Sequence, residues 1–203
     1  MIELGCDETA PGRSFTAPRN SAADLRMMNR MVRWLRVHVM EVVADQPDAV
    51  ADDRRVLDDA GSLHRVVLPD LRSVGCGADL AGVGFFGQAR TDVDHTPICD
   101  LEQQLISAMG DGDGLVAYYN LHRPSEGWSN LVLFTDAEHE HAWGHDTVHR
   151  EAVHRASTHY RSIRLHYGLL PGGWAGTAPM RLDRTTYLDY RDSQTWRAGR
   201  DAG

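Results

Sequence analysis

Between residues 80 and 190, the spacing of apolar residues switches several times between a strand pattern and a helix pattern. The order of these patterns constrains the fold more than any other feature of this chain. Apolar side chains alternate, or run together, where a strand is expected, and recur every three to four residues where a helix is expected. The expected strands are 80–90, 115–123, 128–134, 161–170 and 180–190, and the expected helices are 96–109 and 136–160. Their order is βαββαβ with one extra strand, which predicts an α+β fold.

An amphipathic helix is expected before this region. Ser21 and Asp24 have the spacing of a capping box, and apolar residues then repeat at helical spacing to about residue 46. Residues 47–59 predict a second, weaker helix with an acidic surface, and residues 61–78 predict irregular structure. The apolar stripe of the first helix needs a partner, so we expect it to pack on the later domain.

The chain is expected to divide into two parts. Residues up to about 19 are rich in proline, glycine and small polar residues, which predicts a flexible or wrapping tail. We therefore expect residues 1–79 to form an N-terminal tail and helices packed on the core, and residues 80–203 to form the core domain. The βαββαβ order of that domain is that of a ferredoxin-like unit.

Composition excludes several classes of function. A net charge of −8 argues against a general nucleic-acid binder. No apolar run approaches the ~20 residues of a membrane helix and the N-terminus lacks a signal-peptide pattern, so we expect a cytoplasmic protein without a membrane partner. The three cysteines, Cys6, Cys76 and Cys99, lack metal-site spacing and are expected to be reduced thiols. The chain contains no lysine, which excludes Schiff-base chemistry.

Histidine is concentrated in one segment. Seven of the eleven histidines lie between residues 139 and 166. On a single helix, His141, His145 and His149 would form one column, because residues four apart share a face. His145 and His149 border the apolar stripe and are candidates for burial, whereas His139 and His154 are expected to be solvated. The spacing of His145 and His149 is that of a zinc helix, but the acid between them is aspartate and no third ligand is identifiable, so no metal site is predicted.

Alternation along the strands sorts polar and aromatic side chains onto shared faces. Arg164 and His166 share one face of their strand, opposite Ile163, Leu165 and Tyr167. Two interpretations remain open: this polar face is the exposed side of a monomeric sheet, or it lines a pocket for a flat ligand with oxygen substituents. The other candidate substrate-binding residues are Tyr118, Asn120, His122, Trp128, Asn130 and Gln88.

Two stretches of residues 80–190 resemble a known family. Residues 128–134, followed by a helix carrying residues 143–152, are similar to the third strand and second helix of antibiotic-biosynthesis monooxygenase-like proteins. The resemblance implies a dimeric α/β barrel, a homodimer in which two ferredoxin-like sheets pack face to face around a cavity. Members of this fold include cofactor-independent oxygenases of aromatic substrates, haem-binding or haem-degrading proteins, cyclases and proteins of no known activity. The first 79 residues lie outside the resemblance.

This resemblance and the histidines predict an oxygenase or oxidase of an aromatic or polycyclic, polyketide-like intermediate of secondary metabolism. His145, His149 or His166 would deprotonate the small aromatic substrate so that it reacts with O₂, and Arg164 would hold the resulting anion. No cofactor is required, although reduced flavin remains open.

Two alternatives remain. The first is a haem-binding enzyme of the same fold with His149 or His154 as axial ligand, although the resemblance places the ligand position at Val153. The second is a non-redox cyclase or a ligand-binding module that uses the same pocket.

Overall fold

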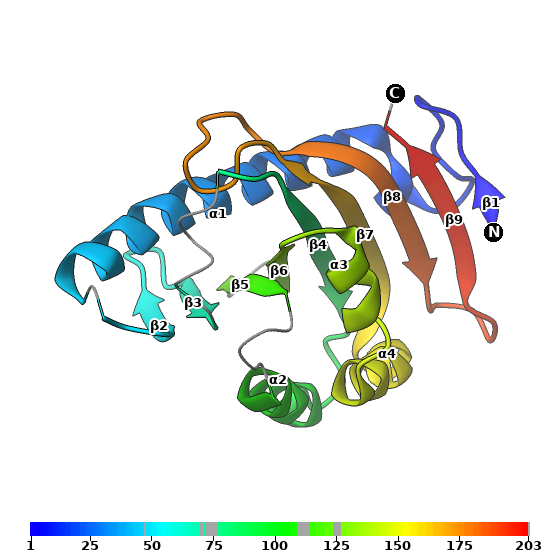
Figure 1. Cartoon of the computed structure of the whole chain (residues 1–203). Helices are drawn as coiled ribbons and strands as arrows, with labels where there is room; N and C mark the ends of the chain where they lie inside the picture. Colours follow the sequence, from blue (N-terminus) through cyan, green and yellow to red (C-terminus); the bar gives the residue numbers. More distant parts are fainter. Residues whose placement is uncertain (47, 70, 72–76, 109–113, 124–126, 203) are drawn as a thin grey trace.

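The computed structural model describes residues 1–46, 48–69, 71, 77–108, 114–123 and 127–202. Within them, nine strands form one sheet in the order β1-β9-β8-β7-β4-β6-β5-β3-β2, accompanied by four α-helices (Figure 1). The expected α+β class is confirmed. The chain is not a simple ferredoxin-like βαββαβ unit with one extra strand, because the sheet continues beyond the expected strands on both sides.

The centre of the sheet follows the predicted pattern. Its antiparallel strands are β4 (Leu80–Ala89), β5 (Leu115–Arg123), β6 (Gly127–Phe134), β7 (Tyr160–Leu170) and β8 (Arg181–Asp189). Helix α2 (Thr96–Ala108) connects β4 to β5. Each of these elements lies within two residues of its predicted bounds, because strong hydrophobic patterning decides the type of an element even when its ends shift.

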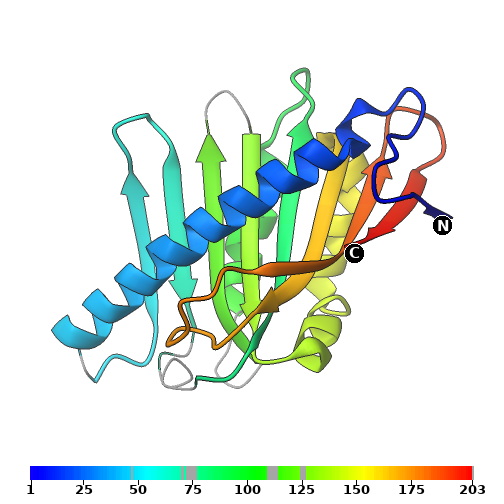
Figure 2. The same cartoon turned by 90° about the horizontal axis from the view of Figure 1, so that it is seen from above.

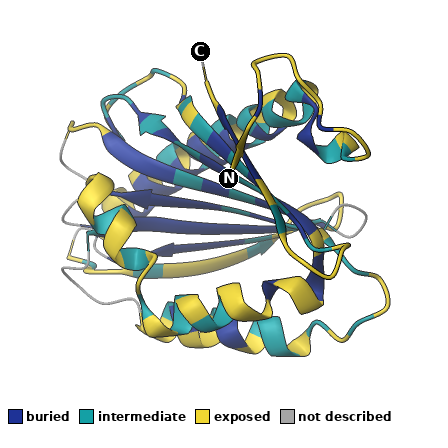
Figure 3. Cartoon of the chain, turned by 90° about the vertical axis from the view of Figure 1, so that its right-hand side faces the viewer, coloured by how far each residue is buried: buried dark blue, intermediate teal, exposed yellow. Residues whose placement is uncertain are grey.

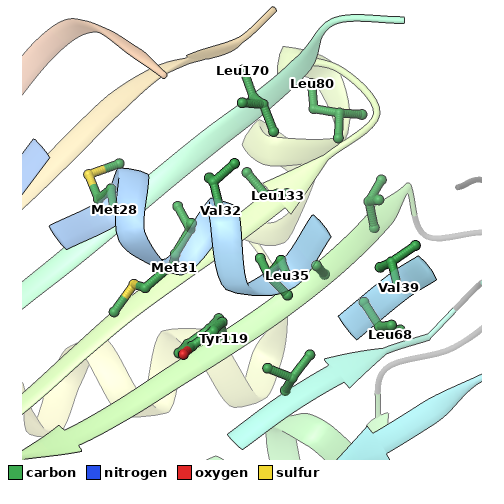
Figure 4. Close-up of a cluster of buried hydrophobic side chains, with 14 of the residues drawn as sticks. Met28, Met31, Val32, Leu35, Val39, Leu68, Leu80, Tyr119, Leu133 and Leu170 are labelled. Atoms are coloured by element: carbon green, nitrogen blue, oxygen red, sulfur yellow. The ribbon is translucent and has the colours of Figure 1, made fainter. Parts of the chain in front are cut away.

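Helix α1 (Pro18–Asp45) lies diagonally across one face of this sheet (Figure 2). Its buried stripe includes Met28, Leu35 and Val39, which pack against the strands together with Tyr119 and Leu133 (Figure 4). The prediction of a helix packed on the later domain is therefore confirmed. Such packing accounts for most of the stability of a helix in a globular protein.

The predicted capping box at the start of this helix is wrong. The helix begins three residues earlier, with Pro18 in its first turn. Proline is favoured there because a backbone N–H at this position would have no partner within the helix. Ser21 instead lies inside the helix, with its hydroxyl 3.0 Å from that of Tyr187, and Asp24 is buried against the sheet.

The described residues between 48 and 78 contain two strands that the sequence did not reveal. The expected weak helix is replaced by β2 (Asp52–Leu57), and the expected irregular stretch contains β3 (Leu63–Leu68). Strand β2 lacks a clear apolar alternation because it contains charged residues that form pairs within the chain. Asp52 pairs with His38 of α1, and Asp53 pairs with Arg65 of β3. An edge strand with paired charges does not show the apolar alternation on which strand prediction depends.

The opposite edge of the sheet contains the two ends of the chain. Strand β9 (Trp196–Asp201) pairs with β8, and β1 (Ile2–Glu3) lies parallel to β9. The N-terminal tail wraps over this edge. The Arg200 guanidinium donates to the carbonyl oxygens of Gly5 and Thr16, and the 3₁₀ turn Ser14–Thr16 then leads into α1.

The predicted helix over 136–160 is two helices, α3 (Ala137–Trp143) and α4 (Thr147–His159). The carboxylate of Asp136 caps α3, and that of Asp146 accepts a hydrogen bond from the backbone N–H of His149 and caps α4. His145 lies in the turn between them. The expected column of histidines on one helix is therefore wrong.

Helices cover both faces of the central strands. Helix α1 covers one face, and α2, α3 and α4 lie on the other (Figures 1 and 2). The central strands are largely buried between these layers, whereas α3 and α4 expose their outer sides (Figure 3). The face that α1 covers is not open for a second sheet, so the expected face-to-face packing is blocked there. None of the described helices is long and apolar enough to cross a membrane.

Candidate functional site

A cavity of about 470 Å³ lies between the sheet and helices α2, α3 and α4. Aromatic rings from both layers form much of its wall: Phe85, Tyr118, Trp128, Phe134, Trp143, Tyr160, Tyr167 and Tyr190. This size is in the range of small-molecule sites in proteins, and aromatic walls suit a flat, largely apolar ligand.

A hydrogen-bonded polar cluster interrupts the aromatic wall. Asn130 Nδ2 donates to the Tyr118 hydroxyl at 3.0 Å, and that hydroxyl donates to Glu102 Oε1 of α2 at 3.3 Å. Asn120 Nδ2 donates to the same Glu102 oxygen. Burial first, and then the charge of Glu102, raise the pKa of Tyr118 well above its usual value, so the phenol stays protonated and acts as a donor.

Two acceptors of this cluster lack a hydrogen bond. Asn120 Oδ1 and Asn130 Oδ1 are buried side-chain oxygens with no partner among the described residues. A buried polar atom without a partner costs about 1–3 kcal/mol, so unpaired oxygens in a cavity wall favour a ligand that donates to them.

Of the three predicted bases, His149 of α4 is the one that both lines the cavity and is half-buried. Burial lowers its pKa, and a hydrogen bond with the backbone of Gly144 opposes this shift only in part. The imidazole is therefore neutral at pH 7, and its buried Nδ1 has no hydrogen-bond partner in the part of the chain that the structure describes. A neutral imidazole with an unused nitrogen is the form that accepts a proton.

The other predicted histidines of this segment occupy different surroundings. His141 and His145 line the cavity from its exposed rim, with their Nε2 atoms 3.3 Å apart. His139 is held by Asp136, and His154 is exposed; neither lines the cavity. The expectation that His154 is solvated is confirmed, and an axial role for it in this cavity is wrong.

Arg164 and His166 lie on the opposite face of the sheet. The guanidinium of Arg164 donates to both carboxylate oxygens of Asp24 in α1. His166 is fully buried, with Nε2 2.8 Å from Asp24 Oδ2 and Nδ1 2.9 Å from Thr185 Oγ1. The expected meeting of these two residues with His145 and His149 in one cavity is therefore wrong.

Alternation along β7 sorted the side chains correctly but did not show which set faces the cavity. Ile163, Leu165 and Tyr167 line it, and the polar set lies under α1. Of the predicted substrate-binding residues, Tyr118, Asn120, Trp128 and Asn130 line the cavity. His122 packs against Trp128 at 4.7 Å between ring centroids, with the rings tilted by 31°, and Gln88 accepts a hydrogen bond from Ser162; neither lines the cavity.

Glu102 is the residue of the site that the sequence analysis missed. A signal was present, because Glu102 lies in the stripe Ile98, Leu101 and Leu105, where an acid interrupts helical apolar spacing. Cys99, also of α2, lines the cavity with a pKa raised first by burial. Cys6 and Cys99 are free thiols, and Cys76 lies outside the described residues.

The cavity fits haem poorly. His149 is the remaining candidate ligand, and none of the described arginines lines the cavity to pair with the two haem propionates. Within the described part of the chain, no group of three or more His, Cys, Asp or Glu side chains could hold a metal ion.

Comparison of the chain with protein-family models, with curated proteins and with solved structures finds no match.

Proposed function

We propose that this chain is an oxygenase or oxidase that acts on an aromatic or polycyclic, polyketide-like substrate of secondary metabolism held in the cavity. The observation that carries the proposal is the combination of an aromatic wall, two unpaired amide oxygens and the half-buried His149. The wall would bind the rings, and the amides would fix the orientation of polar substituents.

The reaction begins with proton transfer. His149 removes a proton from an activated CH₂ group of the substrate, and the resulting carbanion reacts with O₂. The CH₂ group becomes a carbonyl, one atom of O₂ enters the product, and the other leaves as water: R₂CH₂ + O₂ → R₂C=O + H₂O. The substrate supplies all four electrons, so these steps need no other reductant. The free amide oxygens of Asn120 and Asn130 would accept hydrogen bonds from hydroxyl groups of the substrate.

The order of the central strands supports the resemblance on which this reaction class depends. Strands β7-β4-β6-β5, with α2 and the pair α3 and α4 as connections, have the ferredoxin-like strand order. The proposal therefore places a ferredoxin-like unit within the larger sheet, with the substrate between that sheet and its own helices.

Oxygen uptake with an anthrone, a polycyclic phenol with an activated CH₂ group, tests the proposal. Purified protein should accelerate O₂ consumption above the uncatalysed rate and form one quinone per O₂ consumed. Tight binding of the anthrone without O₂ uptake would favour the cyclase or binding-module alternative. An absorption spectrum of the same preparation tests for bound haem or flavin, and a Soret band would contradict the cofactor-free reaction.

The expected homodimer is part of this proposal, with a different interface. Because α1 covers one sheet face, we propose that two copies join through the outer edge of β2, which pairs only with β3 within the described residues. Antiparallel pairing around Arg54 sets Asp53 of each copy opposite Arg55 of the other, and these opposite charges attract. The two Arg54 side chains then face each other at the two-fold axis, where each is paired with Glu41 of its own chain.

Sedimentation at micromolar concentration should therefore show a species of twice the chain mass of 22.6 kDa. Arg55→Glu should shift it toward monomer, because two pairs of like charges then face each other. Arg150→Glu, an exposed change on α4, is the control and should leave the dimer intact. A wild-type monomer would contradict the dimer and leave the cavity proposal unaffected.

A further inference from the structure

The charged side chains of the cavity are unusual for a site that would hold an anion. Among the described residues, two carboxylates, Glu102 and Glu140, line the cavity, and no arginine does. Burial keeps His149, which lies in the cavity wall, neutral. An anionic ligand would therefore enter a cavity whose permanent charges repel it.

Glu102 has bonding capacity left for a ligand. Both of its hydrogen bonds go to Oε1, and Oε2 accepts none from the described residues. The negative charge of Glu102 helps to raise the pKa of Arg65, although the hydrogen bond from Arg65 to Asp53 has the larger effect. The Arg65 guanidinium, however, donates through Nε and Nη2 to the two carboxylate oxygens of Asp53, at 3.1 and 2.8 Å. Within the described residues, the charge of Glu102 is thus not matched by an ion pair of its own.

The unpaired atoms beside Glu102 are also acceptors. Asn120 is 8% exposed, and its Oδ1 has no partner among the described residues. The reverse orientation of this amide would place its oxygen against the Glu102 carboxylate, so the carboxylate fixes which atom remains free. Asn130 Oδ1 is a second unpaired acceptor, because its Nδ2 is used by Tyr118. This part of the cavity therefore offers three acceptors and a negative charge.

We propose that the ligand of this cavity is an aromatic compound that carries a protonated amine, with its ammonium group against Glu102, Asn120 and Asn130. An alkylammonium group has three N–H donors and one positive charge, which match three acceptors and one carboxylate. The electron-rich faces of aromatic residues such as Tyr118 and Trp128 attract the same cation.

This inference rests on the proposed function and removes a difficulty in it. Deprotonation of the substrate creates negative charge in a cavity whose described lining residues include no arginine. A positive charge on the substrate itself offsets that developing charge, so the substrate supplies what Arg164, on the other face of the sheet, does not.

Three probes with the same ring test the inference: naphthylmethylamine, naphthylmethanol and naphthoate, measured by calorimetry at pH 7 with the full chain. The amine should bind about 10- to 100-fold more tightly than the alcohol, because a hydrogen bond between two charged groups is stronger than one from a neutral hydroxyl. The naphthoate should bind most weakly. In Glu102→Gln the preference for the amine over the alcohol should fall to about threefold or less.

Glu138→Gln is the matched control, because it removes one negative charge from the exposed side of α3 and should leave the preference unchanged. The wild-type comparison is decisive even if a variant fails to fold. Equal or tighter binding of the alcohol or the naphthoate would overturn the inference while the aromatic cavity remained. A preference that survives in Glu102→Gln would also overturn it. If none of the probes binds, the proposed function fails.

Discussion

Replacing His149 with asparagine should lower anthrone turnover by about 10²- to 10⁴-fold and change the KM by less than about threefold, as expected for a group that acts by proton transfer. The side chain lines the cavity, and burial lowers its pKa, so at pH 7 it is neutral and able to accept a proton. Asparagine keeps a polar side chain there but provides no base.

The pH dependence gives a second measurement on the same residue. Because the pKa of His149 lies below its ordinary value of 6.5, activity should persist below pH 6.5 and fall only when the pH approaches this lowered pKa. His154→Ala is the matched control, since His154 is exposed on the same helix and should be silent. A loss in His154→Ala equal to that in His149→Asn would contradict the assignment of the base.

The pattern of β7 shows what the sequence can and cannot predict about a site. Period-two alternation separated Arg164 and His166 from Ile163, Leu165 and Tyr167, and the structure keeps these sets apart. Alternation carries no information about which face of a sheet a helix will cover. That information was in α1, where Asp24 occupies the buried stripe four residues before Met28. A carboxylate in such a stripe needs a cation opposite it.

The misassigned helices and strands have local physical causes. Residues 136–160 have helical apolar spacing throughout, but Gly144 and the capping side chain of Asp146 end one helix and start the next. Strand β2 was missed because its charged side chains pair with α1 and β3 rather than alternate with apolar ones. Both errors arise where side-chain bonds outweigh hydrophobic periodicity.

Replacing Asp24 with alanine should lower the free energy of unfolding by about 3–5 kcal/mol, measured by urea denaturation. Asp24 is the shared partner of Arg164 and His166 beneath α1, and its removal leaves a largely buried guanidinium unpaired. Glu151→Gln is the control. It breaks the exposed pair of Glu151 with Arg155 on α4, and exposed pairs contribute less than about 1 kcal/mol.

The network of Asp24, Arg164 and His166 predicts that the folded protein loses stability in acid for two reasons. Burial lowers the pKa of His166, so below its ordinary value of 6.5 the unfolded chain takes up a proton that the folded chain does not, and stability falls. Burial raises the pKa of Asp24, but hydrogen bonds from His166 and Arg164 outweigh this effect and lower it overall. Its contribution is therefore lost as the pH falls below the ordinary value of 3.8.

Arg164→Gln separates a structural role of this network from a chemical one. Because Arg164 lies across the sheet from the cavity, the variant should unfold at lower urea concentration while its anthrone turnover stays within about threefold of wild type. A large loss of turnover with unchanged stability would mean that Arg164 acts on the substrate. In that case the charge that develops during the reaction is held by this arginine, and the ligand has no need to bring a positive charge of its own.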